Sequence, residues 1–351
     1  MARSSTRRLA LAGASLLVAA GCTTAAVTPA LVTPASTAPL TTSTSPAPAS
    51  TATSSSTSTV PSAVTPSTST PAPLPSKSAR PPRADPFDSA NALDGIRELA
   101  AIGPRDAASP AYARAADWVG GQLRAAGYDV REQAFDLPAG VSWGVRVAAG
   151  RPVNVIADPP GFDPSRPHVV IGAHLDTVPQ SPGAEDNASG VATMIELARM
   201  VRQQPTALPV RFIAFGAEEA RGGNGTRYAF GSRHFVTSVG GSDRRAVRGM
   251  VSLDRVGVRA ATVPVCTGGR GTTSLAIAIR GAARAAGVAT NGCTNRGSDH
   301  VSFEAAGIPA VRIGSVPYAG YHSARDVPSV IDPRQLERTG AALWAWLRSL
   351  G

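Results

Sequence analysis

The chain has 351 residues, 43% of them hydrophobic, and its 34 Lys and Arg against 24 Asp and Glu give a formal net charge of +10. Six of the basic residues and none of the acidic ones lie within residues 1–83, so residues 84–351 carry a net charge of only +4. This remainder has no stripe of Lys and Arg interleaved with aromatic residues, which argues against nucleic-acid binding. No apolar run reaches the roughly 18 residues of a membrane-spanning helix, which excludes a polytopic membrane protein.

The first 21 residues have the features of an export signal. Three arginines precede a short apolar stretch at residues 9–20, which ends in small residues before Cys22. Residues 18–22 resemble a bacterial lipoprotein signal, in which Cys22 is lipidated and becomes the N-terminus after cleavage. The resemblance implies an exported protein anchored by a lipid to the outer face of the bacterial cell membrane, with plain secretion as the alternative. The Arg7-Arg8 pair leaves both the general secretory and the twin-arginine export routes open.

Residues 22–84 consist mostly of Ser, Thr, Pro and Ala. Such a segment cannot bury enough apolar surface to offset its conformational entropy, so we expect a disordered linker. Its prolines stiffen the chain, which suits a spacer that holds the following domain away from a membrane.

Two further cysteines, Cys266 and Cys293, remain after the proposed lipid site. A pair of cysteines in an exported protein is expected to form a disulfide, and the absence of a CxxC spacing makes a zinc site a poor alternative.

Residues 85–351 are predicted to form a single α/β domain. Two helical patterns and two β-like runs open it, and apolar strands then alternate with amphipathic helices. This alternation predicts a twisted, mostly parallel mixed sheet between layers of helices. The expected helices are 89–101, 110–126, 190–203, 227–239, 274–286 and 333–350, and the expected strands are 130–137, 153–156, 169–173, 210–215, 249–253 and 310–313.

Polar side chains follow the successive strands of the predicted sheet, at the point where each strand ends. Ligands of open α/β sheets bind beyond the carboxyl ends of the strands, so we expect these side chains to lie together. In chain order they are His174, Asp176, Asp186, Glu218, Glu219, Asp254, Tyr321 and His322.

Four carboxylates of this set would bring a charge of −4 into one cleft, where they would repel one another and take up protons. Two divalent cations remove this conflict. Two histidines and three carboxylates suit a pair of Zn²⁺ ions about 3.5–4 Å apart with one bridging carboxylate. Co²⁺ or Mn²⁺ can substitute at such an oxygen-rich site.

The order and spacing of these residues resemble the co-catalytic zinc aminopeptidases of the M28 peptidase family, over residues 90–350. The resemblance implies one zinc on His174 and Asp254, the other on Glu219 and His322, and Asp186 as the bridge. It also implies Glu218 as general base, Asp176 as the partner of the His174 ring, and Tyr321 as a stabiliser of the oxyanion. The implied reaction is removal of N-terminal residues from peptides with a free N-terminus, by a protein that we expect to be a monomer.

Three alternatives remain open at this stage: a carboxypeptidase, a cyclising transferase that acts on N-terminal glutamine, and a catalytically silent binding lipoprotein on the same fold. Each site residue also has a structural explanation when taken singly, for example a helix cap or a buried histidine. We expect His168 at the surface, and Ser298–His300 either at a helix N-cap or along the substrate cleft. Arg255 is a candidate to favour an acidic first side chain.

Overall fold

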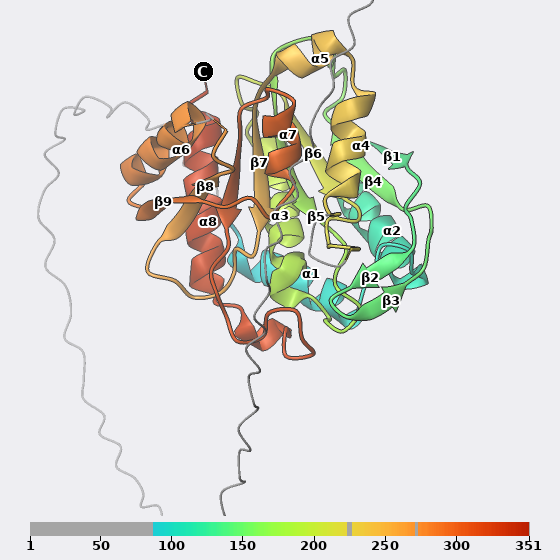
Figure 1. The fold of residues 1–351 in the computed structure, drawn as a ribbon. Helices are drawn as coiled ribbons and strands as arrows, with labels where there is room; N and C mark the ends of the chain where they lie inside the picture. Colours follow the sequence, from blue (N-terminus) through green and yellow to red (C-terminus); the bar gives the residue numbers. More distant parts are fainter. Residues whose placement is uncertain (1–86, 223–226, 271–272, 351) are drawn as a thin grey trace, which may run out of the picture. The chain divides into compact units, whose positions relative to one another are not determined.

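The computed structural model describes residues 87–222, 227–270 and 273–350 (Figure 1). The predicted export signal at 1–21, Cys22 and the linker at 22–84 lie outside the described residues. Within the described residues, none of the helices combines the length and the apolar character that crossing a membrane requires.

A mixed eight-stranded sheet runs through the centre of the described domain, in the order β1-β4-β6-β5-β7-β10-β8-β9 (Figure 1). The four strands β6, β5, β7 and β10 are parallel, β4 pairs antiparallel with both β6 and β1, β8 pairs antiparallel with β10, and β9 is parallel to β8. The strands are β1 (Asp129–Ala134), β4 (Val153–Asp158), β5 (His168–His174), β6 (Val210–Phe215), β7 (Val247–Asp254), β8 (Val263–Thr267), β9 (Thr290–Thr294) and β10 (Ala310–Gly314).

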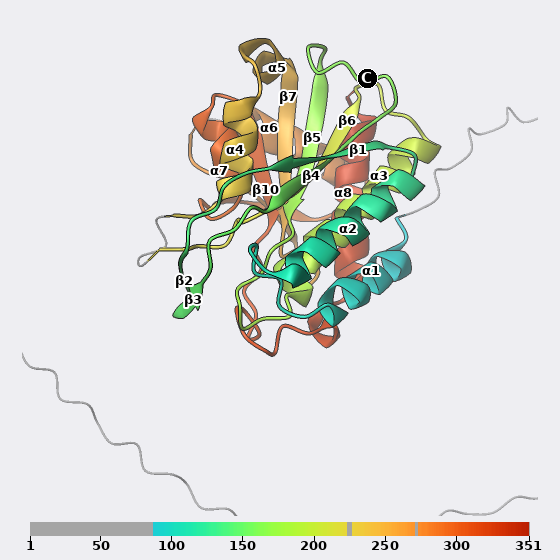
Figure 2. The same ribbon diagram turned by 90° about the vertical axis from the view of Figure 1, so that its right-hand side faces the viewer.

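Helices cover both faces of the sheet, which Figure 2 shows nearly edge-on. One face packs against α2, α3, α6 and α8, with α1 lying against α3 and α8, and the other face packs against α4 and α7; α5 precedes β7. The helices are α1 (Ser89–Ala101), α2 (Pro110–Ala125), α3 (Ser189–Gln203), α4 (Phe230–Ser238), α5 (Gly241–Ala246), α6 (Thr273–Ala285), α7 (His300–Ala305) and α8 (Pro333–Arg348).

Strand β5 shows why the central strands read as continuous apolar runs. Its successive side chains point to opposite faces, so Val169 and Ile171 join the core under α3 while Val170 joins the core under α4 and α7. All three are fully buried. A strand in the middle of a parallel sheet covered on both sides has no solvent face, which removes the polar alternation of an exposed strand.

The fold agrees with the predicted twisted, mostly parallel sheet between helices. Helix α1 has the predicted bounds, and a disulfide joins Cys266 to Cys293 across neighbouring β8 and β9, as expected. The sequence patterns missed β8, β9, α5 and a small hairpin of β2 (Gly140–Ser142) and β3 (Val145–Val147), and they indicated α7 only as a possible N-cap at Ser298–His300. These elements are short or partly exposed, so they lack a periodic apolar pattern.

One expectation about a histidine was wrong. His168 begins β5 and is 1% exposed, not at the surface. Its ring packs edge-on against Phe162, with centroids 4.9 Å apart, and its Nδ1 lies 2.8 Å from the carbonyl oxygen of Arg166. The loop before the strand therefore folds back over a residue that its neighbour Pro167 suggested was exposed.

Candidate metal centre and active site

The carboxyl ends of the parallel strands bring the predicted residues to one edge of the sheet. His174 is the last residue of β5 and Asp254 the last residue of β7, while Glu218 and Glu219 lie in the loop after β6. Asp186 lies in a kinked turn, η1 (Ala184–Ala188), between β5 and α3, and its own backbone is not helical. Of the other three predicted residues, Asp176 lies two residues after β5, and Tyr321 and His322 lie in the loop between β10 and a 3₁₀ turn, η2 (Pro328–Val330).

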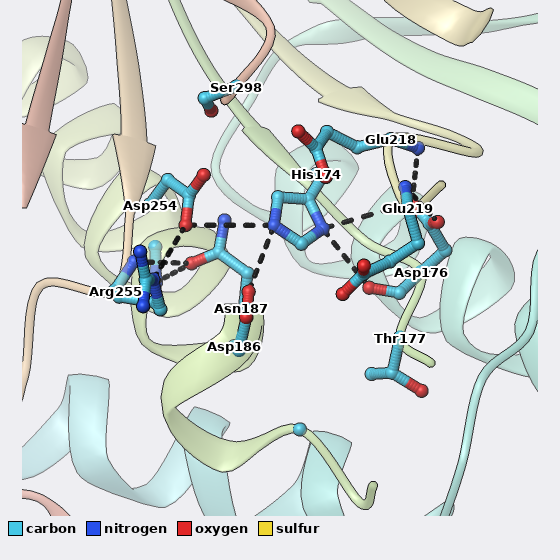
Figure 3. Close-up of polar contacts among 12 residues, drawn as sticks. His174, Asp176, Thr177, Asp186, Asn187, Glu218, Glu219, Asp254, Arg255 and Ser298 are labelled. Atoms are coloured by element: carbon cyan, nitrogen blue, oxygen red, sulfur yellow. Dashed lines mark hydrogen bonds and ion pairs between the residues drawn. The ribbon is translucent and has the colours of Figure 1, made fainter. Parts of the chain in front are cut away.

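These side chains form two groups that share Asp186. In the first, His174 Nε2 lies 3.1 Å from Asp186 Oδ1 and 3.7 Å from Asp254 Oδ1 (Figure 3). In the second, His322 Nε2 lies 3.1 Å from Asp186 Oδ2 and 3.2 Å from Glu219 Oε1. The two oxygens of one carboxylate thus face two different imidazoles, as expected of a bridging ligand.

The spacing of these atoms fits the coordination shell of zinc. Bonds of about 2.0–2.2 Å at a tetrahedral angle place neighbouring ligand atoms about 3.3–3.6 Å apart. The four measured separations run from 3.1 to 3.7 Å, and within each group the ligand atoms lie within 4.8 Å of one another. Imidazole nitrogens with carboxylate oxygens are also a usual donor set for zinc. The residues present therefore fit a pair of divalent cations.

The charges of the site also favour cations. Burial lowers the pKa of His322, but the Asp186 and Glu219 carboxylates outweigh it and raise the pKa to about 9. Burial also lowers the pKa of His174, but the Asp186 and Asp254 carboxylates outweigh this effect and raise the pKa well above its ordinary value. Both imidazoles therefore tend to carry a second proton, whereas an imidazole that binds a metal must be neutral. A bound cation would replace the positive charge of those protons.

Glu218 differs from the ligands in its surroundings. It lines a cavity of about 330 Å³ together with all five candidate ligands, and neither metal-binding group includes it. The pKa of its carboxyl lies well above the ordinary value, and burial is the main cause. The nearby charge of His174 lowers this pKa, whereas the charges of Asp254 and Glu219 raise it further. A carboxylate of raised pKa, free of the metal shell, is suited to accept a proton.

Asp176 supports the site in a different way from the one that we expected. The Nδ1 atom of His174 lies 3.1 Å from the main-chain oxygen of Asp176, and 3.8 Å from its carboxylate. The carboxylate instead accepts hydrogen bonds from the main-chain N–H groups of Glu218 and Glu219, at 2.9 and 3.0 Å (Figure 3). The extended chain after β5 turns this side chain toward the loop after β6, so Asp176 positions Glu218 and Glu219 together.

Tyr321 lies at the mouth of the cavity, with its ring stacked on that of His322 at 3.7 Å between centroids. The guanidinium of Arg255 lies over the same ring at 4.4 Å, donates to Ser315 Oγ at 3.1 Å and lies 3.7 Å from Asp254 Oδ1. Because the Arg255 guanidinium is already engaged by three neighbours, the structure lends no support to the suggestion that it selects an acidic side chain.

Several residues that hold the ligands were not predicted. Asp326 accepts hydrogen bonds from the main-chain N–H groups of Glu185 and Asp186. Arg312, 2% exposed, lies 2.8 Å from Asp254 Oδ1, and this charge together with His174 overcomes the effect of burial and lowers the pKa of Asp254 to about 2. An isolated Asp in a loop and an Arg within a strand carry no signal of such roles in the sequence.

The segment Ser298–His300 lies at the N-terminus of α7, one of the two places expected for it, and none of its three residues lines the cavity. Asp299 occupies the N-cap of α7, yet its side chain makes no capping hydrogen bond. Its carboxyl is buried, which raises the pKa to about 7. Gly297, directly before the segment, lines the cavity.

Relatives of known name resemble this chain over part of their length. Aminopeptidase YwaD of Bacillus subtilis is 34% identical over 182 residues, which are 49% of this chain and 38% of YwaD. The probable lipoprotein aminopeptidase LpqL of Mycobacterium tuberculosis is 43% identical over 72 residues, 20% of this chain and 13% of LpqL. The chain thus spans less than half of each of these relatives.

Solved structures share the fold. A zinc aminopeptidase from Bacillus subtilis superposes with a TM-score of 0.65 at 21% identity, over 74% of this chain and 94% of that one. A glutaminyl cyclase from Bacteroides thetaiotaomicron superposes with a TM-score of 0.66 at 22% identity, over 77% of this chain and 100% of that one. At these identities the likeness establishes the fold.

The model of peptidase family M28 matches residues 154–347, the segment that contains every residue of the two metal-binding groups. Match, fold and site agree: the chain belongs to peptidase family M28.

Proposed function

We propose that this protein is a zinc-dependent aminopeptidase that removes N-terminal residues from peptides. The observation that carries the proposal is the position of Asp186, whose two oxygens face the two histidine groups at 3.1 Å each, next to a Glu218 that lies outside both groups. Membership of family M28 and resemblance to proteins named as aminopeptidases support it.

We assign two zinc ions to the site. His174 and Asp254 would hold one, Glu219 and His322 the other, and Asp186 would bridge them. When bound, zinc supplies a Lewis acid and lowers the pKa of a coordinated water to about 7. Co²⁺ or Mn²⁺ are expected to substitute, because three of the five ligands are carboxylates.

Glu218 is the proposed general base. It takes a proton from the attacking water and passes it to the nitrogen of the leaving amine, a role that contributes typically 10²–10⁴-fold to a rate. Burial raises the pKa of its carboxyl above that of an ordinary glutamate, which makes it a stronger proton acceptor. Asp176 keeps the base in place through the main-chain N–H groups of the Glu218-Glu219 pair.

Tyr321 is the proposed donor to the oxyanion of the tetrahedral intermediate. It lies on the rim of the cavity with its ring stacked on His322, which holds the ring next to the metal-binding groups. A hydroxyl donor placed where negative charge develops stabilises the transition state more than the substrate.

The carboxylates of the site support the expected preference for a free N-terminus. Five of them lie in or next to the cavity, Asp176, Asp186, Glu218, Glu219 and Asp254. Although three arginines also line the cavity, we expect the ammonium group of a peptide to lie in direct contact with one of these carboxylates, where the attraction is strongest. A substrate held by its first amino group presents its first peptide bond to the base.

The proposal is tested with the purified protein and a panel of aminoacyl chromogenic substrates, each with and without a chelator. Hydrolysis of free aminoacyl substrates that a chelator abolishes and zinc restores is the expected result. An N-acetylated peptide should resist cleavage. Cleavage of the blocked peptide at its C-terminal end would instead indicate a carboxypeptidase.

A peptide with N-terminal glutamine distinguishes the cyclising alternative, because cyclisation releases ammonia and leaves every peptide bond intact. Mass spectrometry of the products separates this outcome from release of free glutamine. A protein that binds two zinc ions but changes none of these peptides would be a silent binding lipoprotein.

We further propose that the protein is exported and held at the membrane by lipids on Cys22. The signal-like residues 18–22 support this, and the relative LpqL carries the name of a lipoprotein aminopeptidase. Two or more acyl chains make such attachment durable, since each buried methylene contributes about 0.8 kcal/mol. Replacing Cys22→Ser should move the protein from the membrane fraction to the soluble fraction; retention in the membrane fraction would contradict lipid anchoring.

A further inference from the structure

We propose that the β2–β3 hairpin forms a subsite for a large apolar side chain of the bound peptide, with Trp143 as its contact surface. The inference deepens the proposed aminopeptidase function and rests on it. It concerns the substrate class, which neither the family match nor the two metal-binding groups define.

The first observation is the gathering of exposed apolar side chains at the site. Among the described residues, five large hydrophobic side chains are exposed, and four of them belong to this region. Val141, Trp143 and Val145 lie in the hairpin at 40–54% exposure, and the Tyr321 ring lies 6.1 Å from that of Trp143. Exposed apolar groups that cluster, in contrast to ones scattered singly, mark binding surfaces.

The second observation is the lining of the cavity. Most side chains around it are charged or are candidate metal ligands, including Arg255, Arg296 and Arg312. Trp143 is the largest apolar side chain of the lining and packs edge-on against His322, with 4.2 Å between ring centroids. An apolar substrate side chain next to the metal-binding groups therefore finds its favourable contact on the indole ring.

The third observation is the backbone of Trp143. The turn between β2 and β3 has two residues, Trp143 with φ 46° and Gly144 with φ 85°. Two positive φ angles are typical of a type I′ turn, in which Asn or Asp before Gly is strongly preferred and a bulky residue is disfavoured. The chain thus places a large ring where an Asn would form the turn more easily.

Other residues in this unfavourable conformation also lie at the site. Ala217 precedes Glu218, Arg255 follows Asp254, and His322 is itself a candidate ligand, with φ angles of 53°, 59° and 52°. Backbone strain concentrated in this way is typical of functional sites, where the surrounding packing maintains it. Trp143 belongs to this group by both its position and its conformation.

The hairpin is also tied to the catalytic loop. Arg221, two residues after Glu219, is 3% exposed and donates to the carbonyl oxygens of Ala148 at 2.7 Å and Pro138 at 3.4 Å, one on each side of the hairpin. The same guanidinium pairs with both oxygens of Asp106, at 2.8 and 2.7 Å. This buried arginine fixes the hairpin relative to Glu218 and Glu219, so a side chain resting on Trp143 has a defined position relative to the base.

The ligand that fits is an aromatic or large aliphatic side chain at the first or second residue of the peptide. An edge or face of an indole ring attracts such groups through burial of apolar area and through aromatic pairing. The experiment must therefore vary both positions of the substrate.

The test replaces Trp143→Asn, the residue that the turn prefers. Values of kcat/KM are measured for dipeptides in which Ala, Leu or Phe occupies the first or the second position, with melting temperature and metal content measured in parallel. At one of the two dipeptide positions, we expect kcat/KM to fall about tenfold more for the dipeptide with Phe than for the dipeptide with Ala. The melting temperature should stay equal or rise, since Asn relieves the backbone. Trp143→Phe should recover most of the discrimination.

A matched control is Ile277→Gln, which removes an exposed apolar side chain on α6 that does not line the cavity. Its kcat/KM values should equal those of the unaltered protein. An equal loss of kcat/KM for Ala and Phe dipeptides in Trp143→Asn, or no loss, would overturn the subsite. A fall in metal content would show that Trp143 holds His322 in place as a metal ligand and would contradict a role as a contact surface for the substrate.

Binding distinguishes failure of the subsite from failure of the proposed function. Calorimetry of the Phe dipeptides with the zinc-loaded Glu218→Gln variant, with and without Trp143→Asn, needs no turnover. Loss of affinity on adding Trp143→Asn supports the subsite even where no hydrolysis is found. Equal affinity of the two proteins refutes it even where the unaltered protein is an active aminopeptidase.

Discussion

Asp326 accepts a hydrogen bond from the main-chain N–H of Asp186, at 3.1 Å, although 140 residues separate the two in the chain. The other oxygen of the same carboxylate accepts from Glu185 N at 2.7 Å. Both bonds restrain the kinked turn that presents the Asp186 carboxylate to the two histidines. The bridge of the proposed dinuclear site thus depends on a residue in the loop that also carries His322.

The first prediction concerns this support. Asp326→Ala removes both acceptors, so Asp186 loses its restraint, and we expect affinity for zinc to fall about 10–100-fold. Competition with a chromophoric chelator measures the affinity. Asp332→Asn, at the half-buried N-cap of α8, serves as the control and should bind zinc normally. Unchanged affinity in Asp326→Ala would show that the turn keeps its geometry without this carboxylate.

The second prediction tests the bridge through metal stoichiometry. His322→Ala removes a ligand of one group and leaves His174, Asp186 and Asp254 together, so about one zinc per chain should remain. Asp186→Asn weakens both groups at once, and less zinc should remain than in His322→Ala. Elemental analysis after dialysis measures both. The reverse order of zinc retention would argue against a shared carboxylate.

The third prediction isolates the base. Glu218→Gln removes the proton acceptor and leaves both metal-binding groups intact, so turnover should fall by about 10²–10⁴-fold while two zinc ions per chain remain. Turnover and elemental analysis are measured on the same preparation. Turnover at the parental rate would mean that another group accepts the proton.

The fourth prediction concerns Arg105, which is fully buried beneath the site. Its guanidinium donates to five main-chain carbonyl groups, including those of Leu175, Pro182 and Gly183 in the segment between β5 and η1. Arg105→Leu leaves these oxygens without their donor, so the free energy of unfolding should fall by about 3–5 kcal/mol.

Denaturant unfolding measures this change. Arg105→Lys, which keeps the charge and fewer donors, should lose less stability than Arg105→Leu. The exposed Arg114→Leu on α2 should change the free energy of unfolding by less than about 0.5 kcal/mol. Equal effects of the Arg105 and Arg114 variants would refute the structural role.

The fifth prediction is a pH dependence that arises from His300. Burial is the main cause that lowers its pKa from 6.5 to about 4, while its Nε2 lies 2.8 Å from the carbonyl oxygen of Asn295. Between these two pH values the unfolded chain binds a proton that the folded protein does not. The free energy of unfolding should therefore decrease as pH falls from about 6.5 to 4, by about 3 kcal/mol from this residue.

The measurement compares unfolding of the unaltered protein and His300→Gln at pH 7, 6, 5 and 4. Chelator is present throughout, because protonation of the ligands would release metal in the same range. The difference in the free energy of unfolding between the two proteins should change by about 3 kcal/mol over this range. Parallel curves would mean that His300 titrates normally.

The fold could be predicted where apolar patterns are long. Strands β5, β6 and β7 and helices α1, α3 and α8 have continuous or periodic apolar faces, and burial of those faces determines their place in the domain. The hairpin β2–β3 and the strand β9 have few buried side chains, and β8 is only five residues long. Their positions depend on contacts such as those of Arg221 and on the disulfide, which involve residues distant in sequence.

Strand ends indicated His174, Glu218, Glu219 and Asp254, because parallel strands end at a common edge of the sheet. The complete candidate ligand set, with Asp186 and His322 in their loops, came from the resemblance to family M28. The contacts that hold these candidate ligands in place could not be predicted from the sequence. The carboxylate of Asp176 binds the loop after β6 rather than the His174 ring, Asp326 holds the turn of Asp186, and the strained Trp143 stands beside His322. These relationships require segments that only folding brings within hydrogen-bonding or van der Waals distance, and no local pattern of residues encodes such long-range contacts.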